Sequence, residues 1–117
     1  MFSIEILETQ KAVCRKYGAS FTPTAPDSVA GIATAIGSGA TPISGLRHPK
    51  TEKTSGWYIW AGEYESTDDF FKPTHVKHLI ERSPIVLKYL GLPPGWRFQI
   101  DDKGYEDVWK DDSLLSI

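Results

Sequence analysis

The stretch Gly56-Trp57-Tyr58-Ile59-Trp60 is the strongest strand signal in the sequence, because aromatic and β-branched residues favour an extended backbone. Alternation along a strand places Trp57 and Ile59 on one face and Tyr58 and Trp60 on the other. Both faces are therefore apolar. We expect this strand to lie in the centre of a sheet, or to be covered on one side by a helix and on the other by a loop or a partner.

After this strand and an acidic connection, the sequence predicts two short helices. Pro73 suits the first turn of a helix, where a backbone donor is not needed, and apolar residues follow at helical spacing. We therefore expect one helix over residues 73–82. Ser83-Pro84, a cap residue followed by proline, predicts another over residues 85–90. The apolar stripe of the first helix is Val76, Leu79 and Ile80.

Other segments are predicted to be extended. Residues 96–100 (WRFQI) alternate apolar and polar side chains, and the turn DDKG joins them to residues 105–110 (YEDVWK). This pattern predicts a hairpin. Earlier in the chain, residues 29–36 and 43–49 are also expected to be extended.

Residues 2–17 predict an amphipathic helix, with apolar side chains gathered on one side at about 100° per residue. Gly18 is expected to end it, because glycine adopts the left-handed conformation at low cost. Cys14 lies on the apolar side, which favours a buried, inert thiol. As the sole cysteine, it cannot form an intramolecular disulfide.

The length of 117 residues predicts one domain, residues 1–117. The order of helix, strands, helices and hairpin predicts an α+β fold. We expect a mainly antiparallel sheet with an N-terminal helix and a central pair of short helices. The content of 40% hydrophobic and 24% charged residues is typical of a globular protein.

Charge and hydropathy exclude several classes of partner. The formal net charge is −2, and no basic cluster is apparent, which argues against nucleic-acid binding. No stretch approaches the roughly 20 apolar residues that span a bilayer, so we expect no membrane partner. The N-terminus lacks the pattern of a secretory signal, and we expect a cytoplasmic protein.

No residue pattern favours catalysis, so we expect no enzyme, no metal and no cofactor. His75 and His78 are three residues apart with no glutamate between them, unlike the usual zinc helix, and His48 lies in a separate loop. Adjacent acidic residues in the loops are more typical of solvated surface than of a catalytic pair. No serine has a locally suggested histidine–acid partner.

Four tryptophans are a high number for this length. Tryptophan often anchors protein interfaces, and Trp60 is our candidate for a surface anchor because alternation separates it from Trp57. Arg47 and Glu63 are a candidate ion pair between a loop and the end of the central strand.

Several blocks resemble a known family. They include CRKYG at residues 14–18, PISGLRHP at 42–49, GWYIWAGE at 56–63, LGLPPGWRF at 90–98 and YEDVW at 105–109. Together they resemble an immunity-protein domain family of bacterial polymorphic toxin systems, number thirty-three in its catalogue. The resemblance covers nearly the whole chain.

The resemblance implies a cytosolic protein that binds a toxin domain and blocks it without catalysis. It transfers no catalytic residue. An acidic rim at residues 63–69 would favour a basic toxin surface, such as that of a nuclease. The candidate partner-binding residues are Arg47, His48, Trp60, Glu63, His75, His78 and Arg97.

Two other functions stay open. In the first, the domain binds a small molecule or a metal in a cleft that contains His48, His75, His78 and Glu63, and this requires those side chains to converge. In the second, it is an interaction domain of another kind, with a homodimer formed through an exposed sheet face.

Overall fold

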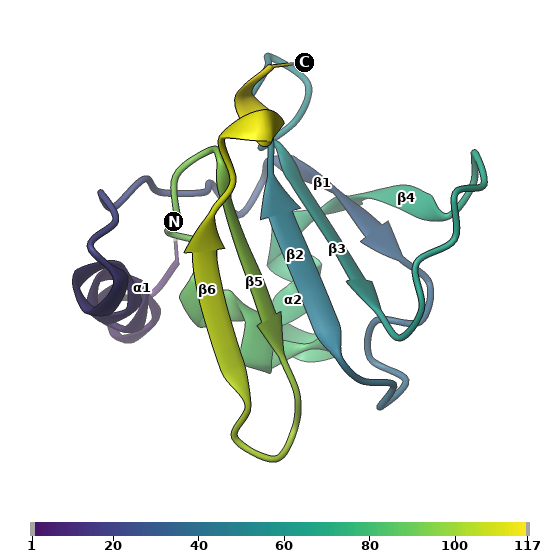
Figure 1. Cartoon of the computed structure of the whole chain (residues 1–117), viewed down its shortest axis with the longest axis horizontal. Coiled ribbons are helices and arrows are strands. Elements are labelled where there is room, and N and C mark those ends of the chain that lie inside the picture. The colour runs from purple at the N-terminus through teal and green to yellow at the C-terminus, as the bar shows by residue number, and fades with distance from the viewer. Residues whose placement is uncertain (1, 117) are drawn as a thin grey trace.

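The computed structural model describes residues 2–116 and shows a helix packed beside a six-stranded sheet (Figure 1). The strands follow the spatial order β4-β1-β3-β2-β5-β6. The helical elements are α1 (Ile4–Tyr17), η1 (Val76–His78), α2 (Leu79–Arg82), η2 (Pro84–Tyr89) and η3 (Asp112–Leu115), of which the η elements are 3₁₀ helices. The strands are β1 (Val29–Ala33), β2 (Ile43–Arg47), β3 (Trp57–Ala61), β4 (Phe71–His75), β5 (Trp96–Ile100) and β6 (Glu106–Lys110).

The aromatic strand β3 lies in the centre of the sheet, as its two apolar faces predict. It pairs in parallel with β1 and antiparallel with β2, and the other neighbouring strands are all antiparallel. The α+β class with a mainly antiparallel sheet is therefore confirmed. The hairpin of β5 and β6 is also confirmed, with Phe98 opposite Val108.

Helix α1 begins at Ile4, two residues later than predicted, because the Ser3 hydroxyl caps it by accepting a hydrogen bond from the backbone N–H of Ile6. Gly18 ends it in the left-handed conformation, with φ of 73°. Gln10 interrupts the apolar side of the helix and is fully buried. Its amide donates to the carbonyl of Leu87 at 2.9 Å, which joins α1 to η2.

The predicted helix over residues 73–82 is wrong at its start. Phe71–His75 forms the edge strand β4, in which Pro73 pairs with Gly31 of β1. An edge strand tolerates proline because one side of it needs no backbone donor. Helical structure begins only at Val76, and the second short helix is the 3₁₀ helix η2.

The helices cover one face of the sheet and leave the other face of its central strands without a helix over it (Figure 1). The core between them contains Trp57, Ile59 and Phe98, each fully buried. Phe98 stacks on Tyr89 of η2 and lies over Gly45 of β2. In the part of the chain that the structure describes, no helix has the length and hydropathy needed to cross a membrane.

Candidate functional site

The sheet face turned away from the helices, here called the outer face, carries Leu46, Tyr58, Phe71, Arg97 and Trp109. Residues that pair directly on neighbouring antiparallel strands point to the same side. Tyr58 pairs with Leu46, Leu46 with Arg97, and Arg97 with Trp109. The Phe71 ring packs edge-on against Tyr58. The outer face therefore carries aromatic side chains from three strands, β3, β4 and β6.

An aromatic cluster occupies the β3–β4 end of this face. Its rings meet mostly edge to face, with centroids 5.2 Å apart for Tyr58 and Phe71 and 5.5 Å apart for Trp60 and Tyr64. Close approach is possible because Gly31 lies under Tyr58, where a Cβ atom would come within 2.6 Å of the ring. The aromatic cluster consists of Tyr58, Trp60, Tyr64, Phe70 and Phe71.

The expectation that Trp60 is an exposed anchor is wrong. Only 8% of Trp60 is accessible, because Tyr64 and Phe71 pack against its ring. Tyr64 is instead the exposed aromatic residue, at 57%. The sequence signal for it was available, since Tyr64 is the one aromatic residue within the acidic stretch 63–69.

The loop of residues 62–70, here called the acidic loop, borders the aromatic cluster. It contains four carboxylates and no lysine or arginine. All four are exposed, and none forms an ion pair with another residue in the range 2–116. The loop therefore presents uncompensated negative charge beside the aromatic cluster. Its carboxylates are Glu63, Glu65, Asp68 and Asp69.

Arg47 is not part of the outer face and does not pair with Glu63, so the expected ion pair is wrong. Its side chain is 1% exposed and points to the covered side of the sheet, over the ring of Trp57. The guanidinium donates to four backbone carbonyls, those of Thr22, Pro23, Ser55 and Leu92. Arg47 thus joins three separate segments to β2.

The histidines do not converge on a common cleft. His48 Nδ1 lies 3.0 Å from the Leu114 carbonyl oxygen, and its ring packs against Tyr58. His75 and His78 are exposed, with ring centroids 6.2 Å apart. Within residues 2–116, no group of three or more histidine, cysteine or acidic side chains is placed to hold a metal. The predicted histidine-containing cleft is therefore not formed.

Arg97 lies at the opposite end of the outer face from the aromatic cluster. Its guanidinium carbon is 5.6 Å from the centre of the Trp109 ring, and Nη1 donates to Asp111 at 3.2 Å. Trp109 is 36% exposed, whereas Trp57 and Trp60 are buried. The outer face therefore has an exposed aromatic residue at each end, Tyr64 and Trp109.

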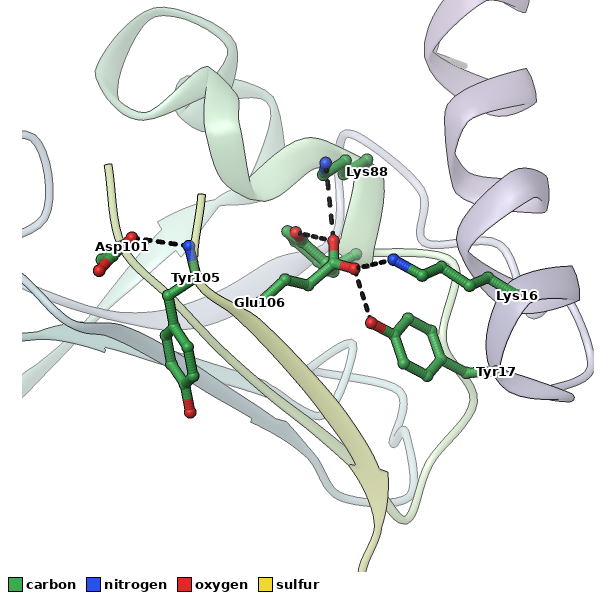
Figure 2. A network of polar contacts seen from close by, with 7 residues as sticks. Lys16, Tyr17, Lys88, Asp101, Tyr105 and Glu106 are labelled. Carbon is green, nitrogen blue, oxygen red and sulfur yellow. Dashed lines mark hydrogen bonds and ion pairs between the residues drawn. The ribbon is translucent and has the colours of Figure 1, made fainter. Parts of the chain in front are cut away.

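A network of polar contacts fixes the covered side of the sheet. The carboxylate of Glu106 on β6 accepts hydrogen bonds from Lys16, Tyr17 and Tyr89, at 2.7, 2.6 and 2.5 Å (Figure 2). Lys16 and Tyr17 donate to Oε2 and Tyr89 donates to Oε1, and Lys88 Nζ also lies 3.7 Å from Oε1. The network joins α1 and η2 to the hairpin, so its role is structural.

Burial of Glu106 acts to raise the pKa of its carboxyl, but the hydrogen bonds from Lys16, Tyr17 and Tyr89 outweigh burial. They lower the pKa to about 2, from an ordinary value of 4.5. Burial and the same hydrogen bond raise the pKa of Tyr89. The carboxylate is therefore ionised and the phenol neutral at neutral pH.

This network predicts a loss of stability in acid. Because the folded pKa of Glu106 lies below the unfolded one, its contribution is complete above pH 4.5 and is lost as the pH falls toward 2. We expect the wild type to lose about 2–3 kcal/mol of unfolding free energy through this group over that window. Urea denaturation at pH 6 and pH 3 measures it.

The variant Glu106→Gln removes the titrating group and should show a smaller change between the two pH values. Asp107→Asn, an exposed neighbour on the same strand, is the matched control and should behave as wild type. If the unfolding free energy fell equally in Glu106→Gln and in wild type between pH 6 and pH 3, Glu106 would not be the group that causes the loss.

The fold and the outer face together define a small α+β domain with one sheet face covered by helices and the other bare and aromatic. The chain belongs to the Imm33-like domain family, a family of immunity-protein domains, whose model matches residues 9–111. No curated protein matches the chain. No solved structure matches it either.

Proposed function

We propose that the protein is an immunity protein that binds a bacterial toxin domain in the cytoplasm. It would neutralise the toxin by covering the toxin's active site. The observation that supports this most directly is the match of an immunity-protein family to residues 9–111 of the chain. The bare outer face provides a place for a protein partner. Occlusion requires binding alone, so the proposed role includes no catalytic step.

The aromatic cluster is the proposed anchor of the interface. Interface hot spots are enriched in tryptophan, tyrosine and arginine that fill a pocket of the partner. Tyr64 is exposed and rests on the buried Trp60, so its ring is held in place before binding. A side chain held in this way loses little conformational entropy when a partner covers it.

The acidic loop indicates the charge of the partner. Four exposed carboxylates beside an aromatic anchor favour a basic protein surface, because complementary charge speeds association and disfavours other partners. A toxin that acts on nucleic acid has such a surface where it contacts phosphates. We therefore propose a nuclease-type toxin domain as the partner.

Most of the candidate partner-binding residues fit this interface. Alternation places His75 on the same side of β4 as Phe71, and His48 packs against Tyr58. Trp60 supports Tyr64 from beneath, and Arg47 points to the covered side of the sheet, away from this face. The proposed interface contains His48, Glu63, Tyr64, His75, Arg97 and Trp109, with His78 at its border and Trp60 beneath it.

The test is inhibition of a purified toxin domain from a polymorphic toxin system of the producing bacterium. The wild type should bind it and block its activity. The variant Tyr64→Ala should weaken binding about 30-fold, as expected for a hot spot worth about 2 kcal/mol. Binding is measured by calorimetry and toxin activity by nucleic-acid cleavage.

Tyr105→Ala is the matched control, because Tyr105 is also an exposed tyrosine, at 45%, but lies at the hairpin, and β6 is at the opposite edge of the sheet from β4. Its hydroxyl donates to Gln99, so it tests the aromatic cluster against another part of the same face. It should bind as wild type does. Equal affinity of the two variants would refute the aromatic cluster as the anchor of the interface. A homodimer formed through the outer face would instead show a doubled mass in solution.

The acidic loop is tested separately by charge reversal. Glu65→Lys combined with Asp68→Lys should slow association by at least tenfold at low salt and leave dissociation nearly unchanged. Added salt should reduce the difference between this variant and wild type, because it screens exposed charges. Unchanged association kinetics would exclude a basic partner surface at this loop.

A further inference from the structure

A groove on the covered side of the molecule is separate from the outer face. It has a volume of about 1200 Å³ and lies between α1, residues 21–29 and residues 50–55. Ligand sites are typically concave and mostly apolar, with a few placed polar groups. Here the apolar wall is formed by Phe2, Leu7, Phe21, Pro26 and Val29. This surface is here called the N-terminal groove.

Arg47 lines the N-terminal groove and brings a buried positive charge to it. No carboxylate within residues 2–116 forms an ion pair with this guanidinium. Buried charges in proteins are normally paired, because an isolated one is costly to desolvate. Burial lowers the pKa of Arg47 to about 10, so the group stays charged at neutral pH.

The hydrogen bonds of Arg47 leave one donor unused. Four of its five side-chain N–H groups reach backbone carbonyls, and Nη2 makes a single bond, 3.4 Å long, to Pro23. Pro23 itself lines the groove. The second N–H of Nη2 has no acceptor among residues 2–116, and an anion in the groove would supply one.

The other charges of the groove also favour an anion. Lys11, Lys50 and Lys53 line it, against Asp27 and Glu52. Asp27 is already paired with Lys77 at 3.1 Å, and Lys11 with Glu8 at 3.9 Å. The remaining charges are Arg47, Lys50 and Lys53 against Glu52. The groove is thus a cationic region in a chain whose net charge is −2.

We propose that the N-terminal groove binds a small apolar carboxylic acid, with its carboxylate at the Arg47 guanidinium and its hydrocarbon part against Leu7 and Phe21. A carboxylate fits better than a phosphate, because one free N–H and one buried guanidinium compensate a single negative charge. Its apolar part would fill the wall of the groove and gain stability from burial. This site does not depend on the proposed toxin interface.

The test compares 1-naphthaleneacetate with its uncharged analogue, 1-naphthaleneacetamide, by calorimetry and by amide chemical shifts. The two probes share size and shape and differ in charge. The carboxylate should bind at least tenfold more tightly than the amide, and the shifts should concentrate in residues 21–29 and 50–55. Equal affinities, shifts elsewhere, or no binding at the solubility limit would overturn the proposal.

A blocking variant avoids substitution of Arg47, which the fold requires. Ala25 is exposed and lines the groove, so Ala25→Trp should fill it and lower the affinity for the carboxylate at least tenfold. Ala12→Trp places the same side chain on the exposed part of α1, outside the groove, and should bind as wild type. Undiminished affinity in Ala25→Trp would place the ligand elsewhere and overturn the assignment.

Discussion

Replacement of Gly56 with alanine is expected to cause a large loss of unfolding free energy. Gly56 has φ of 92°, and a Cβ atom there would lie 1.9 Å from the carbonyl oxygen of His48. The obstacle is backbone, so no side-chain rotation relieves it. The two residues are also joined by a hydrogen bond from His48 N–H to the Gly56 carbonyl at 2.9 Å. The strain therefore falls on the start of the β2–β3 pairing.

The magnitude follows from two separable costs. The positive φ alone costs a non-glycine residue about 1–2 kcal/mol. The clash raises the expected total to about 4 kcal/mol or more, a large part of the 5–15 kcal/mol that stabilises a typical domain. Urea denaturation followed by tryptophan fluorescence measures the loss.

Gly104→Ala is the matched control, because Gly104 has φ of 96° but no atom within 4 Å of the added Cβ. It carries the conformational cost without the clash and should lose only about 1 kcal/mol. If Gly56→Ala were as stable as Gly104→Ala, the close approach of His48 would not exist in solution.

Arg47→Met is expected to destabilise the protein by about 3–4 kcal/mol. Methionine removes a buried charge, which recovers its desolvation cost. The four backbone carbonyls that accept from Arg47, however, lose this hydrogen-bond donor. An unsatisfied buried acceptor costs about 1–3 kcal/mol, so the orphaned carbonyls outweigh the recovered desolvation. Chemical denaturation at neutral pH measures the change.

Arg82→Met tests whether burial causes the large loss of stability expected for Arg47→Met. Arg82 also donates to backbone carbonyls, those of Ala33, Thr34 and Ile36, but it is only partly buried. Water can replace its hydrogen bonds, and we expect a loss of about 1 kcal/mol. An Arg47→Met variant as stable as Arg82→Met would show that the carbonyls around Arg47 are also hydrated.

Local sequence patterns were sufficient to predict much of the fold. Two apolar faces placed β3 in the centre, alternation gave the bounds of β5, and Gly18 marked the end of α1. Strand β4 was missed because Pro73 suits either a first helical turn or an edge strand, and only pairing with β1 decides between them.

The candidate site was harder to predict because its exposure depends on contacts between distant segments. Tyr64 reaches back across the end of β3 and covers Trp60, a contact that strand alternation does not encode. Arg47 takes its acceptors from residues 22, 23, 55 and 92, and no local pattern links these positions. The negative charge of the site was easier to predict, because the carboxylates of the acidic loop lie in one continuous stretch of the sequence.

The strand order has a consequence for how the chain folds during synthesis. Strand β3 lies between β1 and β2, which both precede it, while β5 and β6 follow all the other strands. Such distant pairings give a high contact order and slow folding. At roughly 5–20 residues per second, a ribosome completes the hairpin several seconds after β3. Until Phe98 emerges, its ring cannot pack over Gly45 or against Trp57, so the core of the growing chain is incomplete on that side.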